Sequence, residues 1–167
     1  MILRDATIGS FLEDIASEAP APGAGSAAAV ALAVGIACAR KAIILTLKHH
    51  PDEEGLRALD AHLAGLGDQA LAGGEADMAC FTVFIQEMQR PKEDEGRKPA
   101  MQQALTNLIS VGENLVAIGD EARQKLLEVK TDIYPAMMND ISAALALIAA
   151  ARSIHNACVA ESGRALA

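Results

Sequence analysis

Residues 20–39 read Pro20-Ala-Pro-Gly-Ala-Gly-Ser26-Ala-Ala-Ala-Val-Ala-Leu-Ala-Val-Gly-Ile-Ala-Cys-Ala39, and the rest of the chain is organised around this stretch. The prolines and glycines at its start form a turn that cannot continue a helix. Ser26 stands directly before an Ala-rich apolar run, which is the usual place of a helix N-cap. We therefore expect a helix from about Ser26 to Lys48, with a Gly-rich loop presented at its start.

The helix expected at 26–48 has no charged side chain before Arg40. A helix that is apolar on all sides is a buried one. Its many alanines, together with Gly35, let neighbouring helices approach closely. We predict that it is the central helix of a bundle.

Composition favours an all-α fold. Of the 167 residues, 51% are hydrophobic but only 2% aromatic, so Ala, Leu, Ile, Val and Met must fill the core. This length and apolar content suit a single domain, residues 1–167, and small, mostly unbranched side chains favour helices over sheets. The net charge of −8 argues against a nucleic-acid partner, because such binding depends on Lys and Arg that neutralise phosphates.

Apolar residues at helical spacing predict further helices on both sides of the central one. One follows Thr7, and one follows Pro51, is kinked or interrupted at its glycines up to Gly73-Gly74 and resumes at Glu75. One spans about Pro99 to Val129, and one runs from Asn139 or Asp140 to Gly163. The expected architecture is an antiparallel bundle of about five helices. The helices at 26–48 and 139–163 are so apolar that we expect a face shared with a second copy, in an isologous homodimer.

Cysteine usage and the N-terminal sequence indicate the environment of the protein. Cys38, Cys80 and Cys158 lie among apolar residues without CxxC spacing, which is typical of reduced core cysteines and not of a disulfide framework or a zinc site. The N-terminus has no signal-peptide pattern, so we expect a cytoplasmic protein. The uninterrupted apolar stretch 27–39 is too short to span a bilayer, so we expect no membrane segment.

The loop at the start of the central helix carries a family resemblance. Pro22-Gly-Ala-Gly-Ser26, followed by Gly35 and by Leu45-Thr46, resembles the Pro-Gly-Gly-Gly-Ser signature of the cyclodeaminase/cyclohydrolase family. From the residue types alone, Gly23, Gly25 and Ser26 form a turn and cap, or present backbone N–H groups that bind an anion or a carbonyl oxygen. The resemblance implies that they bind the polar edge of a folate, near the boundary between two subunits.

The acidic pair Glu75 and Asp77 has two readings. From the residues alone, both are solvated acids in the first turn of a helix, where the helix dipole favours them. The family has Asp-x-Asp-Ala-x-Ala-Phe here, which Asp77, Ala79 and Phe81 match. The resemblance implies that Asp77 is the catalytic acid/base, and that Glu75, in place of the first aspartate, helps to bind substrate.

Asn139 and Asp140 form a second candidate pair. From the residues alone, either is a helix N-cap. The family has Ser-Asp at this place, so the resemblance implies that Asp140 orients or assists the catalytic step. Asn139 stands where the family has serine and is assigned to substrate binding.

Lys48 and His49 lie at the end of the central helix. From the residues alone, cationic side chains there complement the helix dipole. The family tends to have two basic residues in this region, which implies that Lys48 and His49 bind the glutamate tail of a folate.

The resemblance implies a folate one-carbon enzyme that needs no metal or other cofactor, with a tetrahydrofolate derivative as its substrate. The favoured activity is hydrolysis of 5,10-methenyltetrahydrofolate to 10-formyltetrahydrofolate, because nothing in the 167 residues resembles a formiminotransferase domain. Two alternatives stay open: formiminotetrahydrofolate cyclodeaminase, and a divergent protein that binds folate or another small heterocycle without turnover. Ile44 and Cys158, which stand where the family often has asparagine, motivate the last alternative.

Overall fold

The computed structural model describes residues 1–166 and consists of helices. The elements are α1 (Ile8–Ile15), α2 (Ala24–His49), α3 (Glu54–Met88), α4 (Arg97–Val129), the 3-10 turn η1 (Pro135–Met137) and α5 (Met138–Leu166). No strand occurs within residues 1–166. The prediction of an all-α bundle of about five helices is confirmed.

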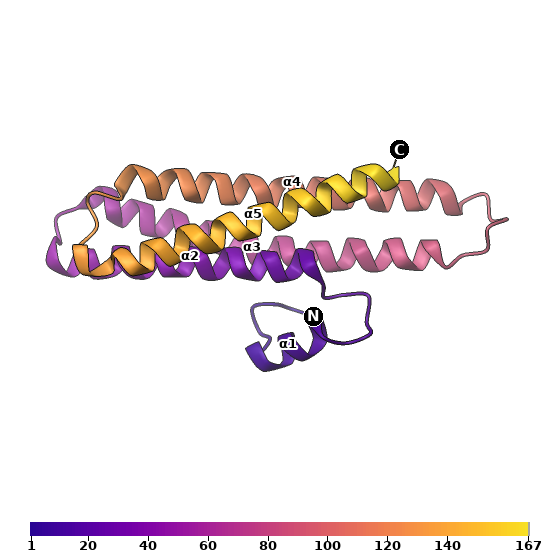
Figure 1. Cartoon of the computed structure of the whole chain (residues 1–167), viewed down its shortest axis with the longest axis horizontal. Coiled ribbons are helices and arrows are strands. Elements are labelled where there is room, and N and C mark those ends of the chain that lie inside the picture. The colour runs from indigo at the N-terminus through magenta and orange to yellow at the C-terminus, as the bar shows by residue number, and fades with distance from the viewer. Residues whose placement is uncertain (167) are drawn as a thin grey trace.

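The four long helices run alternately up and down and form a closed ring (Figure 1). Each packs against the next along the chain, and α5 returns to pack along α2, so that α2 contacts both α3 and α5. The α3–α4 hairpin extends beyond the N-terminal end of α2, and the short α1 lies outside the bundle near that same end. The ring therefore has four helices over part of its length and fewer at the hairpin end.

Helix α2 provides the centre of the core, as its sequence predicts. Ala28, Leu32, Ala39 and Ile43 are fully buried and belong to one aliphatic cluster with side chains of α3, α4 and α5. The helix begins two residues earlier than expected. Gly23 is its N-cap, and Ser26 is the third helical residue.

Helix α3 is continuous, so the predicted interruption at Gly73 and Gly74 is wrong. Both glycines lie where another helix or the N-terminal segment approaches closely. A Cβ on Gly73 would lie 2.6 Å from Cδ2 of Leu115, and one on Gly74 would lie 2.8 Å from Cβ of Ala29. These glycines are there because the neighbours leave no room for a side chain, and not because the helix ends.

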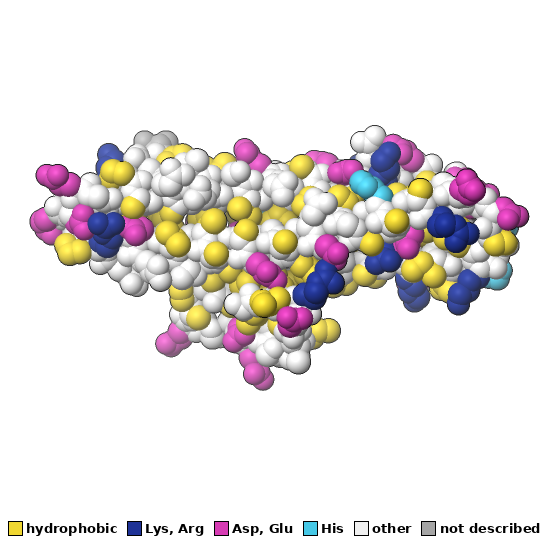
Figure 2. Space-filling view, turned by 180° about the vertical axis from the view of Figure 1, so that it is seen from behind, with side chains coloured by type: hydrophobic (Ala, Val, Ile, Leu, Met, Phe, Trp, Pro, Cys, Tyr) yellow, Lys and Arg dark blue, Asp and Glu magenta, His cyan; other side chains and the backbone are white. Residues whose placement is uncertain are grey.

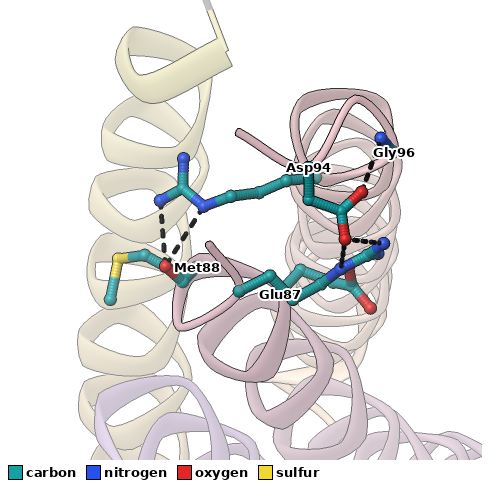
Figure 3. Close-up of polar contacts among 6 residues, drawn as sticks. Glu87, Met88, Asp94 and Gly96 are labelled. Atoms are coloured by element: carbon teal, nitrogen blue, oxygen red, sulfur yellow. Dashed lines mark hydrogen bonds and ion pairs between the residues drawn. The ribbon is translucent and has the colours of Figure 1, made fainter. Parts of the chain in front are cut away.

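The tip of the α3–α4 hairpin is a loop rich in charged residues, and polar contacts close it (Figure 3). The guanidinium of Arg97 donates to the Met88 carbonyl oxygen from Nε at 3.3 Å and from Nη2 at 2.9 Å. Asp94 accepts the Gly96 N–H at 2.9 Å and is paired with Arg90. The hairpin is thus tied at its tip.

By length and composition alone, α2 and the stretch Pro135–Leu166 are apolar enough to cross a membrane, whereas the expectation above considers only the uninterrupted apolar stretch 27–39. This is weak evidence, because the core helix of a bundle meets the same criterion. Helix α2 is such a core helix, with eleven buried residues.

Candidate functional site

A pocket of about 430 Å³ lies where α2 begins, among α2, α3, α4 and α5. Its walls are mostly apolar, with few polar side chains. The lining residues are Pro20, Ala21, Gly23, Ala24, Gly25, Asp77, Phe81, Phe84, Leu105, Leu108, Cys158, Glu161, Ser162 and Ala165.

The pocket exists because α2 is shorter than its neighbours at this end. Helix α2 starts at Ala24, beside the C-terminal half of α3. Helix α3 continues past this point to Met88 before the hairpin turns. The chain before Gly23 leaves the bundle toward α1. Beyond that point α3, α4 and the last turns of α5 enclose a space that no helix fills.

Asp77 lies against the start of α2. The backbone N–H of Ser26 donates to its carboxylate, and a Cβ on Gly25 would lie 2.5 Å from Cγ of Asp77 and closer still to both carboxylate oxygens. Glycine is therefore required at position 25, because any side chain would occupy the place of the carboxylate. A helix N-terminus favours a negative charge there.

Ser26 is fully buried and holds the loop in place. Its hydroxyl accepts the Gly23 N–H at 3.0 Å and donates to the Gly23 carbonyl oxygen at 3.1 Å. Its own backbone N–H belongs to the first turn of α2, where N–H groups have no intrahelical partner, and is therefore free to meet Asp77. Ser26 thus acts on the pocket through the loop and is not among the residues that line it.

Burial raises the pKa of Asp77 above its ordinary value, and the Ser26 N–H opposes that shift only in part. None of the residues that line the pocket is Lys, Arg or His, so no cation of the lining offsets the burial. A carboxyl group with a raised pKa takes up a proton more readily than an ordinary aspartate, which suits an acid/base group.

The opposite walls come from α3 and α5. Phe81 and Phe84 line the pocket with ring centroids 6.2 Å apart and planes tilted by 40°. On α5, Cys158 and Glu161 face the same space. Burial raises the pKa of the Cys158 thiol, and the carboxylates of Asp77 and Glu161 both add to that rise. Both carboxylates therefore lie near this thiol.

Glu75 does not line the pocket. Its Oε1 accepts the backbone N–H of Leu3 at 2.7 Å, and Leu3 packs with Phe11 and Met78 in a small second core. The structure therefore gives Glu75 a structural partner, the N-terminal segment, and places it away from the lining where substrate binding was expected.

Four other predicted site residues lie at the opposite end of α2. Asp140 pairs with Lys41 at 3.3 Å, Asn139 is exposed, and Lys48 and His49 end the helix. From Gly25 to Lys41 the helix rises by about 24 Å, since each residue adds about 1.5 Å. Within one chain, Asp140 and Asp77 therefore do not meet.

Figure 2 shows the face of the molecule opposite to that of Figure 1, with Lys and Arg side chains gathered toward the end that holds the C-terminus of α2. His49 stacks on Tyr134 there, with centroids 4.2 Å apart and planes 17° from parallel. Among residues 1–166, no group of three or more His, Cys, Asp or Glu side chains is arranged to hold a metal ion.

Sequence reasoning missed Glu161 and Phe84, singled out Phe81 only as part of the family motif, and noted Cys158 only as a core cysteine at a position where the family often has asparagine. The only available signal for Glu161 is a change of pattern. Residues 141–160 contain one formally charged side chain, Arg152, and Glu161 ends that run. Nothing in the spacing says that this end of α5 returns to the level of Asp77.

Comparisons with known proteins agree with this geometry. The formiminotransferase-cyclodeaminase family matches residues 7–160. The fold is similar to the crystal structure of formiminotetrahydrofolate cyclodeaminase from Thermotoga maritima, with a TM-score of 0.88 and 18% identity over 98% of this chain and 81% of that one. No match is found among curated protein sequences. The chain belongs to the formiminotransferase-cyclodeaminase family, a family of folate-metabolising enzymes of the cyclodeaminase/cyclohydrolase type.

Proposed function

We propose that the protein hydrolyses 5,10-methenyltetrahydrofolate to 10-formyltetrahydrofolate, with Asp77 as the acid/base. The observation that carries this proposal is the position of Asp77, a carboxylate of raised pKa in an apolar pocket, with the Ser26 N–H as its partner. Family membership supplies the class of substrate. The cytoplasm is the compartment that fits such an enzyme.

The proposed reaction uses the carboxylate twice. As the oxygen of a water molecule bonds to the bridge carbon between N5 and N10, Asp77 accepts the proton that the water loses. The tetrahedral adduct then loses its hydroxyl proton to solvent, the bond from carbon to N5 breaks, and Asp77 gives its proton to N5. One proton is released overall, because the substrate is a cation and the product is not.

The pocket supplies position as well as a proton acceptor. Phe81 and Phe84 offer apolar faces to a planar ring system, and the backbone around Gly23 and Gly25 offers polar groups to its edge. Holding water, carboxylate and bridge carbon together removes most of the entropic barrier to their reaction. No step needs a metal ion.

Cyclodeamination of formiminotetrahydrofolate is the second candidate. It is favoured by the similarity to a solved structure that bears that name. The same carboxyl group would donate its proton to the departing ammonia while N10 bonds to the formimino carbon. The two reactions differ in substrate and share the requirement for Asp77.

We also propose a homodimer through the outer face of α2 and α5. Val34 and Ile44 are 48% and 42% exposed on α2, and Ile154 is 38% exposed on α5. The other exposed side chains of α5 between Asp140 and Glu161 are Ser142, Ala143, Ala146, Ala149, Ala150, Ser153, Asn156, Ala157 and Ala160. A face so short of charge is suited to a second copy.

A two-fold axis through the middle of this face explains the distribution of the predicted residues. The apolar part of α5 is centred near residue 150, so a perpendicular two-fold axis brings the partner's Asp140 to about the level of residue 160. The partner's Lys41 stays paired with the partner's Asp140 there, and the partner's Lys48 and the partner's His49 lie beside the pocket, where they would bind the glutamate tail of the folate. Asp140, Asn139, Lys48 and His49 would thus serve the neighbouring subunit's site.

The first test follows the loss of the near-ultraviolet absorbance of methenyltetrahydrofolate against its spontaneous rate. We expect acceleration by the wild-type protein and a loss of about a thousandfold in Asp77→Asn, as is typical for removal of an acid/base group. Glu113→Gln, which removes an exposed acid of α4 outside the pocket lining, is the control and should keep full activity. If formiminotetrahydrofolate reacts instead, the second candidate holds; if neither substrate reacts with a folded protein, the chain only binds.

Subunit complementation tests the shared site. Asp77→Asn and Asp140→Asn chains are each purified and then mixed so that dimers re-form. If each pocket uses Asp77 of one subunit and Asp140 of the other, a mixed dimer has one intact site and about half of the wild-type activity. Mixtures that stay as inactive as their parents would show that Asp140 does not act across the interface.

A further inference from the structure

The acidic side chains of the pocket have no cation among the lining residues. Asp77 lies on one side against the start of α2, and Glu161 lines the pocket from the last turns of α5. Burial raises the pKa of the Cys158 thiol in the same lining, and both carboxylates add to that rise. No Lys, Arg or His is among the lining residues that the structure describes.

The rest of the lining suits a flat, apolar ligand. Phe81 and Phe84 are tilted by 40° to one another and stand with leucines of α4 around the cavity. An aromatic face attracts a cation as well as an apolar ring. A cavity of about 430 Å³ with aromatic walls and two carboxylates is therefore complementary to a planar heterocycle that carries positive charge.

We propose that Glu161 is a charge-selecting residue: its carboxylate makes the pocket prefer a planar heterocyclic cation over a neutral analogue of the same shape. This inference rests on the proposed function, whose substrate carries its positive charge at the bridge between N5 and N10. Asp77 faces the reacting carbon, whereas Glu161, which is exposed at the pocket mouth, acts on the ligand before and after the reaction. Glu161 is thus a specificity residue and takes no proton.

The test compares the dissociation constants of two probes, methenyltetrahydrofolate as the cation and 5-formyltetrahydrofolate as the analogue without that charge. Binding is measured by equilibrium dialysis in the Asp77→Asn background, where the proposed reaction is blocked. The variants are Glu161→Gln, Glu161→Asp and Glu113→Gln. The last removes an exposed acid from α4, outside the pocket lining, and controls for net charge.

We expect Glu161→Gln to lower the preference for the cation by about three- to tenfold at low ionic strength, as for a partly solvated charge pair. Glu161→Asp should keep part of the preference, and added salt should reduce the difference between the variants. Glu113→Gln should leave the preference unchanged. Equal weakening of both probes in Glu161→Gln would mean that Glu161 only shapes the pocket, and would overturn the proposal.

The proposed function and the charge selection fail in different ways. If the wild-type protein does not accelerate hydrolysis, the preference for the cation, given by the ratio of the two dissociation constants, can be measured without the Asp77→Asn substitution. The proposal stands if Glu161→Gln lowers this preference. If hydrolysis is accelerated but the ratio is the same in Glu161→Gln, the function holds and the selection does not. Binding of neither probe would overturn the selection as well.

Discussion

One aspartate lies beside each end of α2, Asp77 on α3 and Asp140 on α5. The surroundings of the two aspartates differ. At the N-terminal end, Asp77 is partly buried beside an apolar pocket, and its partner is the backbone N–H of Ser26. At the C-terminal end, Asp140 is paired with Lys41 at 3.3 Å. The first carboxylate has a raised pKa, and the second is balanced by a cation.

This difference shows what makes a carboxylate chemically useful. Burial without a cation in the pocket lining raises the pKa of Asp77 and makes proton uptake easier, whereas Asp140 lies in an ion pair with Lys41. Both aspartates lie on helices among small residues, so their local sequences look alike. Their roles differ because the start of α2 and the last turns of α5 come together at Asp77 and not at Asp140.

The largest effect among the following predictions is expected for Gly25→Ala, a substitution that affects only the end of α2 that faces Asp77. A Cβ at position 25 would lie 2.5 Å from Cγ of Asp77, so the carboxylate must leave its place. A displacement of about 1 Å at a reacting group costs on the order of a hundredfold in rate, which kcat for methenyltetrahydrofolate hydrolysis would report.

The matched control is Gly65→Ala. Gly65 is also in a helix, but nothing lies within 4 Å of a Cβ built there. We expect unchanged activity and a gain of about 1 kcal/mol in the free energy of unfolding, from better helix propensity. If Gly25→Ala kept wild-type kcat, the contact between the loop and Asp77 would have no catalytic meaning.

The next prediction concerns how the free energy of unfolding depends on pH at the pocket end of the bundle. His155, on the pocket half of α5, is 1% exposed, and burial lowers its pKa to about 4 from 6.5. Below pH 6.5 the unfolded chain binds a proton that the folded chain refuses until about pH 4. The free energy of unfolding should therefore fall as pH drops through this window, by about 2 kcal/mol between pH 7 and pH 5.

Urea unfolding of wild-type protein and His155→Leu at both pH values checks this prediction. The variant cannot titrate at this position, so its stability should fall less with pH. Asp77 has the opposite sign, because its raised pKa favours the folded state as pH falls, but it is present in both proteins and cancels in the comparison. Equal pH dependence in the two proteins would contradict the neutral, buried state of His155.

Sequence patterns predict the helices well because helical periodicity and apolar content are local properties. They also find the loop around Gly25 and Asp77, through a motif. They cannot place Glu161 at the pocket or Asp140 away from it, because both facts depend on how far α5 runs back along α2. Gly73 and Gly74 show the same limit. From the sequence alone, a glycine pair predicts a break in the helix, whereas in the structure the two glycines make room for Leu115 and Ala29.

The smallest expected effect concerns Glu75, which lies two residues from Asp77 yet serves a different purpose. Its carboxylate accepts the Leu3 N–H at 2.7 Å and so holds the segment that leads through Phe11 to the pocket loop. Glu75→Gln keeps an acceptor oxygen but removes the charge, so we expect a loss of about 1 kcal/mol in the free energy of unfolding. Hydrogen exchange of the Leu3 and Phe11 amides should rise, whereas kcat should stay near that of wild type. A large fall in kcat with unchanged exchange would instead return Glu75 to the substrate site, and the contrast between the two ends of α2 would then involve two carboxylates at the pocket end of α3 and not one.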